Sequence, residues 1–468
     1  MRDLLLFGII VGLIPFILRR PWLGVVAWFW IGLMVPQAHT WGFMRTFPLA
    51  MLIGGVTLAA LVVNRDRRNL PMTREMVMMF VLAAYMTMTT YFAVYRSGAW
   101  AQWESVMKIL LMTFVTPMLI FGPRRIVWVI LVTVVSLGFY GFKGGLFTIS
   151  TGGSYMVLGP PRSFISGNTY IGLAMVMVLP LILVTARFFN ERWFDLGWPL
   201  KQSWYKGIGL GFYAMFWLTG LAIIATYSRG AWLGLLAVAP FVFLRMRRKW
   251  AIVAAAVLAL GVVGIAAPDR MVERWQTIGG YEEDTSAMQR IQSWGANWNM
   301  AVERPLTGMG FRNVEMGYAW WISYANFEGY WRHALSPHSI YFQMLGQHGF
   351  GGLFVFLTLI AFTWLTLGRI KRQAKKADQK WLSEYAWAIQ IAFIGYLVSG
   401  AFLDVAYFNL VYAFIALAII MRRELDETAA FSPAQYRPVS LPAGTQAIGA
   451  GARTQGVAAV GGMHVRRD

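Results

Sequence analysis

Long apolar stretches alternate with short polar connectors along most of the chain. A helix needs about 20 mainly apolar residues to cross the hydrocarbon core of a bilayer, and it satisfies its own backbone hydrogen bonds there. The candidate spans cover residues 4–18, 22–35, 47–63, 76–95, 107–122, 126–142, 168–187, 207–227, 231–244, 251–267, 339–367, 384–402 and 404–421. Because the first two are short, the pattern predicts an all-α, polytopic membrane protein of about 12 transmembrane helices.

One connector, residues 268–338, is much longer than the others. Connectors of this length are usually functional or disordered, and the many tryptophans of this one favour an ordered structure. Ser286 to Glu303 has the periodicity of an amphipathic helix, which Pro305 would end. Such a helix suits the headgroup level of a membrane, with Arg290 aimed into a polar cleft.

The pattern divides the chain into four parts. Residues 1–267 hold the N-terminal transmembrane helices, 268–338 form a loop domain, and 339–423 hold the C-terminal transmembrane helices. Residues 424–468 are rich in Gly, Ala, Pro and Thr without periodicity, which predicts a disordered cytoplasmic tail. The first apolar stretch ends in Arg-Arg-Pro rather than in small residues, so we expect a membrane helix there and not a cleavable signal peptide.

Basic residues gather in short connectors between the spans. Such connectors mark the cytoplasmic side of a membrane protein, so they account for the formal net charge of +20 without a nucleic-acid partner. The opposite side then holds the connector 143–167, the turn 228–230 and the loop domain, while the side of the N-terminus stays open. The basic positions are Arg19, Arg20, Arg65, Arg67, Arg68, Arg124, Arg125, Arg245, Arg247, Arg248, Lys249, Arg369, Lys371, Arg372, Lys375, Lys376, Arg422 and Arg423.

Four polar residues on this opposite side are candidates for chemistry. Ser336 and Pro337 form a helix-start signature, so we expect His338 in the first helical turn, where the helix dipole favours a neutral, proton-accepting imidazole. The other three are Arg162, Arg229 and Arg290. Guanidinium groups match phosphate oxygens and stay charged, so these arginines suit a diphosphate. A base beside an anion site at a membrane surface indicates transfer chemistry on a phosphate-bearing lipid.

Ordinary structural roles compete with this interpretation. An arginine at the end of a span is more often an interfacial anchor than part of a site. His348 falls inside a span, and we expect it to be a helix-packing residue. The sequence contains no cysteine, Asp-x-Asp motif or HExxH motif, so no metal ligands are evident. It also lacks a Walker A motif, so we expect no ATP and no other cofactor.

Three short motifs stand in order between residues 160 and 355. They are Ser228-Arg229-Gly230, then Arg290-x-x-x-Trp294 with Pro305-Leu306-x-Gly308-x-Gly310, then Pro337-His338-Ser339 with Gly349-x-x-Gly352. In this order they resemble the O-antigen ligase/polymerase family of bacterial envelope glycosyltransferases, and within it the lipopolysaccharide O-antigen ligases. The N-terminal block is similar to variants called exosortase-associated ligases at Arg20-Pro21-Trp22 and Trp41-Gly42-Phe43. The family often has Asn where Ser339 stands, so we assign no role to Ser339.

The resemblance implies a multi-pass protein of the bacterial inner membrane whose loop domain faces the periplasm. The donor would be an undecaprenyl-diphosphate-linked glycan, and the acceptor would be a sugar hydroxyl of lipid A-core. His338 would accept the proton of that hydroxyl, while Arg162, Arg229 and Arg290 would bind the diphosphate. The reaction would invert the anomeric carbon and need neither metal nor ATP, because the diphosphate linkage carries the driving force.

Other functions are compatible with the same residues. An O-antigen polymerase or a protein O-oligosaccharyltransferase of the same family would differ in its acceptor alone. A transporter of lipid-linked saccharide would carry ionisable residues near the bilayer centre, and Asp404 at a span edge comes nearest to that position. A non-catalytic scaffold would not need His338.

Overall fold

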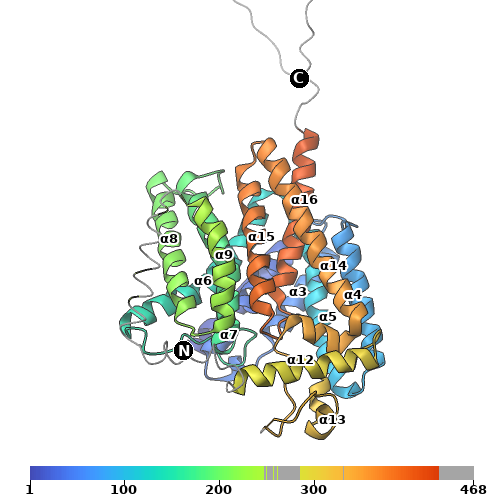
Figure 1. The fold of residues 1–468 in the computed structure, drawn as a ribbon. Coiled ribbons are helices and arrows are strands. Elements are labelled where there is room, and N and C mark those ends of the chain that lie inside the picture. Colours follow the sequence, from blue (N-terminus) through green and yellow to red (C-terminus); the bar gives the residue numbers. More distant parts are fainter. Residues whose placement is uncertain (247–248, 250–256, 258–260, 262–284, 330, 432–468) are drawn as a thin grey trace, which may run out of the picture. The chain divides into compact units, whose positions relative to one another are not determined.

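The computed structural model describes residues 1–246, 249, 257, 261, 285–329 and 331–431. This part of the chain forms α-helices and no strand, which confirms the predicted all-α class for it (Figure 1). The helices are α1 (Arg2–Arg19), α2 (Trp22–Met34), α3 (Leu49–Val63), α4 (Arg74–Tyr91), α5 (Arg96–Leu119), α6 (Pro123–Ser150), α7 (Gly167–Glu191), α8 (Gln202–Ile224), α9 (Arg229–Arg245), α12 (Thr285–Glu303), α13 (Tyr318–Ile322), α14 (Ile340–Lys376), α15 (Lys380–Gly400) and α16 (Asn409–Phe431).

Each predicted span has a helix at its place, except the span 251–267, which lies almost wholly outside the described residues. Among the described residues, four helices, α6, α7, α8 and α14, are long and apolar enough by themselves to cross a membrane. The shorter helices α2 and α3 are also apolar. The protein is therefore a helical membrane protein, and the count of about 12 spans stays a prediction.

The helix α6 extends further than the hydropathy pattern predicts. It continues to Ser150, although we expected a connector over 143–167. The last turns of α6 contain Gly144 and Gly145, and a Cβ added at Gly145 would collide with the backbone of Leu218 in α8. Because these two glycines have no side chains, the backbones of α6 and α8 pack directly against each other. This contact keeps the extra turns of α6 helical.

The helix α16 also passes a predicted boundary. It continues to Phe431, although we expected a disordered tail over 424–468. An ion pair between Arg422 and Asp426, one turn apart, stabilises the helix beyond the apolar segment. The predicted start of the disordered tail at residue 424 was therefore wrong. The remainder of the predicted tail, 432–468, lies outside the described residues.

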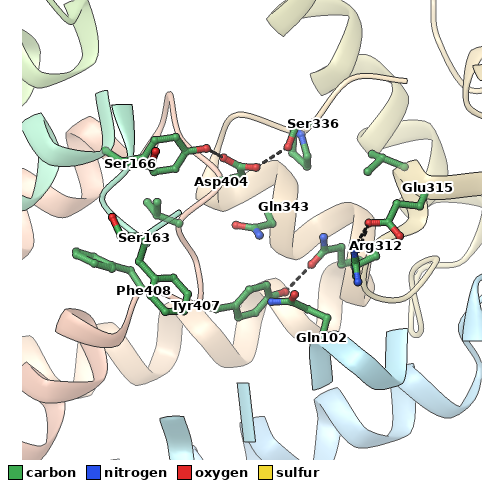
Figure 2. Close-up of a pocket in the computed structure, with 16 residues that line it drawn as sticks. Gln102, Ser163, Ser166, Arg312, Glu315, Ser336, Gln343, Asp404, Tyr407 and Phe408 are labelled. Atoms are coloured by element: carbon green, nitrogen blue, oxygen red, sulfur yellow. Dashed lines mark hydrogen bonds and ion pairs between the residues drawn. The ribbon is translucent and has the colours of Figure 1, made fainter. Parts of the chain in front are cut away.

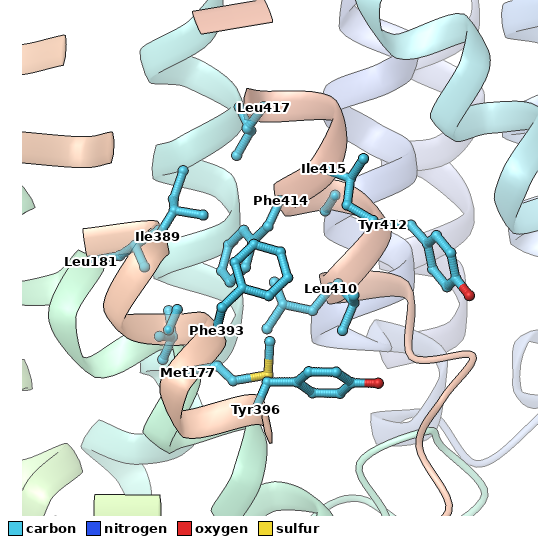
Figure 3. Packing of buried hydrophobic residues seen from close by; sticks show 14 of the residues in the cluster. Met177, Leu181, Ile389, Phe393, Tyr396, Leu410, Tyr412, Phe414, Ile415 and Leu417 are labelled. Atoms are coloured by element: carbon cyan, nitrogen blue, oxygen red, sulfur yellow. The ribbon is translucent and has the colours of Figure 1, made fainter. Parts of the chain in front are cut away.

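The helix α7 is buried along most of its length and packs against α6, α8, α9 and α15. A helix that is apolar on all sides gains most when other helices surround it. Figure 3 shows Met177 and Leu181 of α7 among side chains of α15 and α16. Phe393 of α15 meets Phe414 of α16 there, with ring centroids 6.1 Å apart. This apolar packing fixes the relative positions of the helices whose ends carry the polar residues.

The basic connectors gather at one end of the bundle. Arg125 at the start of α6 bonds Asp66 in the α3–α4 connector at 2.9 Å. Arg245 at the end of α9 pairs with Glu384 near the start of α15. The first residues of α7, α9 and α14 and the last residues of α15 therefore lie at the other end. Assignment of the basic end to the cytoplasm and of the other end to the periplasm stays a prediction.

A break in α14 holds the segment that follows α12. The helix is interrupted at Gly349, whose φ of 66° and ψ of −172° lie in a backbone region that is essentially restricted to glycine. The carbonyl oxygens of Gly346 and Gln347, just before the break, accept backbone hydrogen bonds from Met309 and Gly310, both at 2.9 Å. Two of the motifs found in the sequence, the glycine-rich segment 305–310 and the glycine at 349, thus dock on each other.

We expect Gly349→Ala to destabilise the protein. An alanine with φ of 66° and ψ of −172° costs roughly 1–3 kcal/mol, because this backbone region is essentially restricted to glycine, and the added Cβ would collide with the Pro305 carbonyl oxygen, which adds about 1–3 kcal/mol. Thermal unfolding in detergent measures the loss. Gly220→Ala is the matched control, because a Cβ at Gly220 in α8 meets no atom within 4 Å. Equal melting temperatures for the two variants would contradict this role of Gly349.

Candidate active site

The helix α12 lies across the start of α14 and holds the chain in front of it. Ser293 donates a hydrogen bond to the carbonyl of Ser336 at 2.8 Å, and the indole N–H of Trp294 donates to the carbonyl of Pro337 at 3.0 Å. The Trp294 ring also stacks on Phe342 of α14, with centroids 5.4 Å apart. The amphipathic helix expected over 286–303 is therefore confirmed, and it fixes the residues on either side of His338.

Two faces of α12 differ in their surroundings. Small and polar side chains, among them Ser293, Ala296 and Asn297, are buried against α14. The apolar residues Trp298 and Val302 are half exposed. An amphipathic helix on a soluble protein would bury Trp298 and Val302 instead. The arrangement therefore suits a helix whose outer face meets lipid headgroups and acyl chains.

His338 does not lie in the first turn of α14, so that expectation was wrong. The helix starts at Ile340, and its first backbone bond runs from Gln343 to the carbonyl of Ser339 at 2.8 Å. His338 itself has a left-handed backbone, with φ of 46°. The bond from Trp294 to the Pro337 carbonyl holds the chain in this turn, and a residue with positive φ cannot begin a right-handed helix.

Asp404, in the connector between α15 and α16, is the acidic neighbour of His338. Its carboxylate accepts hydrogen bonds from the Tyr170 hydroxyl of α7 and from the Ser336 hydroxyl, both at 2.5 Å (Figure 2). Asp404 Oδ1 lies 4.0 Å from His338 Nδ1, so the two groups interact through charge rather than through a hydrogen bond. The sequence marked Asp404 only as an acid at the edge of a span.

Burial decides the charge state of His338. It lowers the pKa of the imidazole below its ordinary value of 6.5, and the positive charge of Arg290 acts in the same direction. The negative charge of Asp404 opposes them but does not reverse the shift. His338 is therefore neutral at pH 7 and able to accept a proton. We predicted the neutral form, but burial rather than the helix dipole is its main cause.

The structure brings Arg290 to His338, since the charge of Arg290 acts on the imidazole. Arg229 is the first residue of α9, after the N-cap Ser228. The next residue, Gly230, packs its backbone on Phe402, whose ring lies 6.3 Å from that of Trp294 on α12. The start of α9 and the helix bearing Arg290 therefore meet at the same end of the bundle.

The side chain of Arg162 is less closely associated with His338 than that of Arg290. It is exposed and has a left-handed backbone, with φ of 60°. Ser163 and Ser166, from the same connector, line a cavity together with Asp404. The connector of Arg162 thus reaches the site, while the Arg162 side chain faces the surroundings.

A polar cavity of about 450 Å³ is lined by Ser336, Pro337 and Asp404, which are neighbours of His338 (Figure 2). Its polar lining consists of Gln102, Ser163, Ser166, Tyr170, Arg312, Glu315, Ser336, Gln343, Gln347, Asp404 and Tyr407. Arg312 and Glu315 form an ion pair at 2.5 Å, so Asp404 leaves the lining with one net negative charge. The side chains come from α5, α7, α14 and four connectors, which is why no local motif predicted the cavity.

Two glutamines of α14 shape the wall of this cavity. Gln343 accepts a hydrogen bond from the backbone N–H of Ala406 at 2.9 Å, and Gln347 accepts one from the Tyr407 hydroxyl at 2.7 Å. Both carbonyl oxygens are thereby used to hold the α15–α16 connector. The NH₂ groups are the donors that these side chains offer to a ligand.

His348 is a packing residue, as expected. Its two ring nitrogens meet the hydroxyls of Thr89 at 2.6 Å and Tyr407 at 2.8 Å, and the side chain is fully buried. The edge of the Phe311 ring contacts it as well. The imidazole joins α4, α14 and the α15–α16 connector.

Two parts of the chain match known families. Residues 214–357 match the family described as O-antigen ligase, and residues 1–190 match DUF5935, a family of unknown function. The first match supports the O-antigen ligase/polymerase family and a glycosyl-transferring enzyme, without separating ligase from polymerase. Arg229, Arg290 and His338 lie within it, whereas Asp404 lies outside both matches. No curated protein is significantly similar to the chain.

We expect Asp404→Asn to lower the pKa of His338 further, because the substitution removes the negative charge 4.0 Å from Nδ1. Diethyl pyrocarbonate modifies neutral imidazole, so mass spectrometry of His338 modification against pH measures the shift. The midpoint should move to lower pH in the variant. Asp426→Asn, at the basic end of the bundle, is the control. A midpoint that rises or stays would show that Asp404 does not act on His338.

Proposed function

We propose that the protein is an inverting glycosyltransferase that uses neither metal nor ATP. It transfers an O-antigen glycan from undecaprenyl diphosphate to a sugar hydroxyl of lipid A-core, at the periplasmic face of the inner membrane. The proposal depends above all on one observation, the position of His338 with Asp404 Oδ1 4.0 Å from its Nδ1 and with the charge of Arg290 acting on its imidazole. The family match over residues 214–357 supports glycosyl transfer as the chemistry at this place.

The arginines would bind the donor. Arg162, Arg229 and Arg290 would contact the diphosphate, and the charge of Arg290 also acts on His338. Negative charge grows on the diphosphate as the bond to the anomeric carbon breaks, and guanidinium groups held in place stabilise that charge. They take the part that a divalent cation plays in other glycosyl transfers.

His338 would act as the general base. The acceptor hydroxyl attacks the anomeric carbon, its proton passes to the imidazole, and the bonding electrons of the old linkage leave with the diphosphate. Attack from the side opposite the leaving group inverts the configuration. Asp404 would stabilise the imidazolium that forms, because its charge favours protonated His338. Tyr170 and Ser336 hold the carboxylate in position for this role.

The cavity beside His338 would hold sugar rather than diphosphate. Its lining carries one net negative charge, which repels an anion. Side-chain amides, hydroxyls and carboxylates are the groups that exchange hydrogen bonds with sugar hydroxyls, and Phe164, Tyr407 and Phe408 add aromatic surface. The site would thus have a cationic part for the leaving group and a polar part for the saccharide, with His338 between them.

A reconstituted reaction tests the proposal. The purified protein is given undecaprenyl-diphosphate-linked glycan and, in separate reactions, lipid A-core, a second lipid-linked glycan, or a peptide rich in Ser and Thr. Product on lipid A-core supports the ligase. Product on the second glycan alone indicates a polymerase, and product on the peptide alone indicates a protein O-oligosaccharyltransferase. If no acceptor is glycosylated while donor is moved across proteoliposomes, the protein is a transporter and the proposal fails.

We expect His338→Ala to slow transfer by about 10²–10⁴-fold, the usual contribution of a general base. Donor binding should persist, because the arginines remain. His333→Ala is the matched control, as His333 is an exposed histidine five positions earlier in the same connector. Wild-type transfer should also fall as the pH drops below the lowered pKa of His338, since protonation removes the base. A fully active His338→Ala protein would exclude His338 from the reaction.

We expect Arg290→Gln to weaken donor binding and to reduce kcat by roughly 10²–10³-fold, because the substitution removes a positive charge from the leaving group. Binding of the lipid-linked donor and initial rates measure the two effects separately. Arg332→Gln is the control, since Arg332 is an exposed arginine of the same loop domain. Equal effects of both variants would show that Arg290 acts only through the total charge.

A further inference from the structure

A second cavity, of about 430 Å³, lies at the basic end of the bundle, away from the candidate active site. We propose that it binds the phosphate of an anionic phospholipid headgroup. The cavity is lined by Arg20, Trp22, Asp66, Arg124, Arg125 and Trp128. The site does not depend on the proposed function, because none of these residues belongs to the catalytic arrangement.

Four segments build the cavity. Arg20 lies between α1 and α2, Trp22 begins α2, Asp66 lies in the α3–α4 connector, and the other three residues lie in the first turns of α6. The Asn64 side chain donates a hydrogen bond to the carbonyl of Leu18 at 2.7 Å, which joins the ends of α1 and α3 beside the cavity. The wall is therefore assembled by helix packing and is not a flexible run of basic residues.

Arg125 is held in place by its neighbours. Its guanidinium donates to both oxygens of Asp66, at 3.0 and 2.9 Å, and to the carbonyl of Leu119 at 3.1 Å. It also lies 4.0 Å above the ring of Phe121 and 5.6 Å from that of Trp22. One face of the cavity thus carries a fixed guanidinium, the group that matches phosphate oxygens best.

The charges of the lining do not balance. Asp66 neutralises one of the three guanidiniums, so the cavity keeps two net positive charges. A further acid, Asp195, feels the charge of Arg124 but pairs with Arg192 at 3.3 Å and is mostly exposed. Guanidinium groups that share a small cavity repel each other, and a bound anion relieves that repulsion.

The surroundings favour a lipid over a soluble anion. Trp22 and Trp128 line the cavity, and tryptophan is enriched at the level of the headgroups. Val62 and Val63, at the end of α3 shortly before Asp66, are strongly exposed, as expected for side chains that face acyl chains. Basic pockets between membrane helices on the cytoplasmic side bind anionic headgroups. The phosphate would lie among the arginines and the acyl chains along α3.

Native mass spectrometry of the full-length protein in detergent tests the proposal. The probes are phosphatidylglycerol, phosphatidylcholine and soluble glycerol phosphate. We expect phosphatidylglycerol to bind more tightly than phosphatidylcholine. Arg20 and Arg124 are both exposed, so the double variant Arg20→Gln/Arg124→Gln should fold. It should bind phosphatidylglycerol about 30-fold more weakly, since each basic residue near an anionic lipid contributes about fivefold.

The matched control is Arg369→Gln/Arg372→Gln, which removes the same charge at the same end from exposed residues outside the cavity. It should keep its affinity, and Arg20→Lys/Arg124→Lys should recover most of the loss. An equal loss in the control overturns the proposal, because it would indicate general surface attraction. Glycerol phosphate binding as tightly as phosphatidylglycerol, with the same loss in the variant, would overturn the lipid assignment and indicate a soluble phosphate ligand.

Discussion

The candidate site depends on the way α12 and the segment after it dock on α14. At Gly349 the helix gives up its regular backbone bonds, and two of its carbonyl groups accept N–H groups from the segment 305–310 instead. The backbones of α14 and of the segment 305–310 lie so close that no side chain fits between them, which explains the glycines in both. Trp294 then fixes the Pro337 carbonyl, so the turn that presents His338 is set by a helix more than 40 residues earlier.

Burial and charge together give this turn its chemical character. An exposed imidazole would titrate near neutral pH, but the walls of the site keep His338 unprotonated. Arg290 and Asp404 act on it with opposite signs. The same division continues around it, because Arg290 lies on α12 and Arg229 begins α9 at the same end of the bundle, while the adjoining cavity carries a net negative lining. Separate surfaces can therefore serve an anionic leaving group and a neutral, hydroxyl-rich partner.

Arginine serves more than one purpose in the bundle. At one end, arginines pair with acids and carbonyl groups and tie helix ends together, as Arg125 and Arg245 do. At the other end, Arg312 pairs with Glu315 in the same way, while the charge of Arg290 also acts on the imidazole of His338. Because a guanidinium stays charged in either setting, its role follows from its neighbours rather than from its own chemistry.

The sequence by itself determined the helical class, the places of the described helices that match predicted spans, the amphipathic helix over 286–303 and the motif residues. Each of these depends on local periodicity or on turn-forming residues, which neighbouring positions encode. Tertiary structure alone decided the left-handed turn at His338, the partnership with Asp404 and the polar cavity. Asp404 stands 66 positions from His338, and its bond to Tyr170 spans 234 positions. The packing of apolar helices sets such distances, and no local pattern records it.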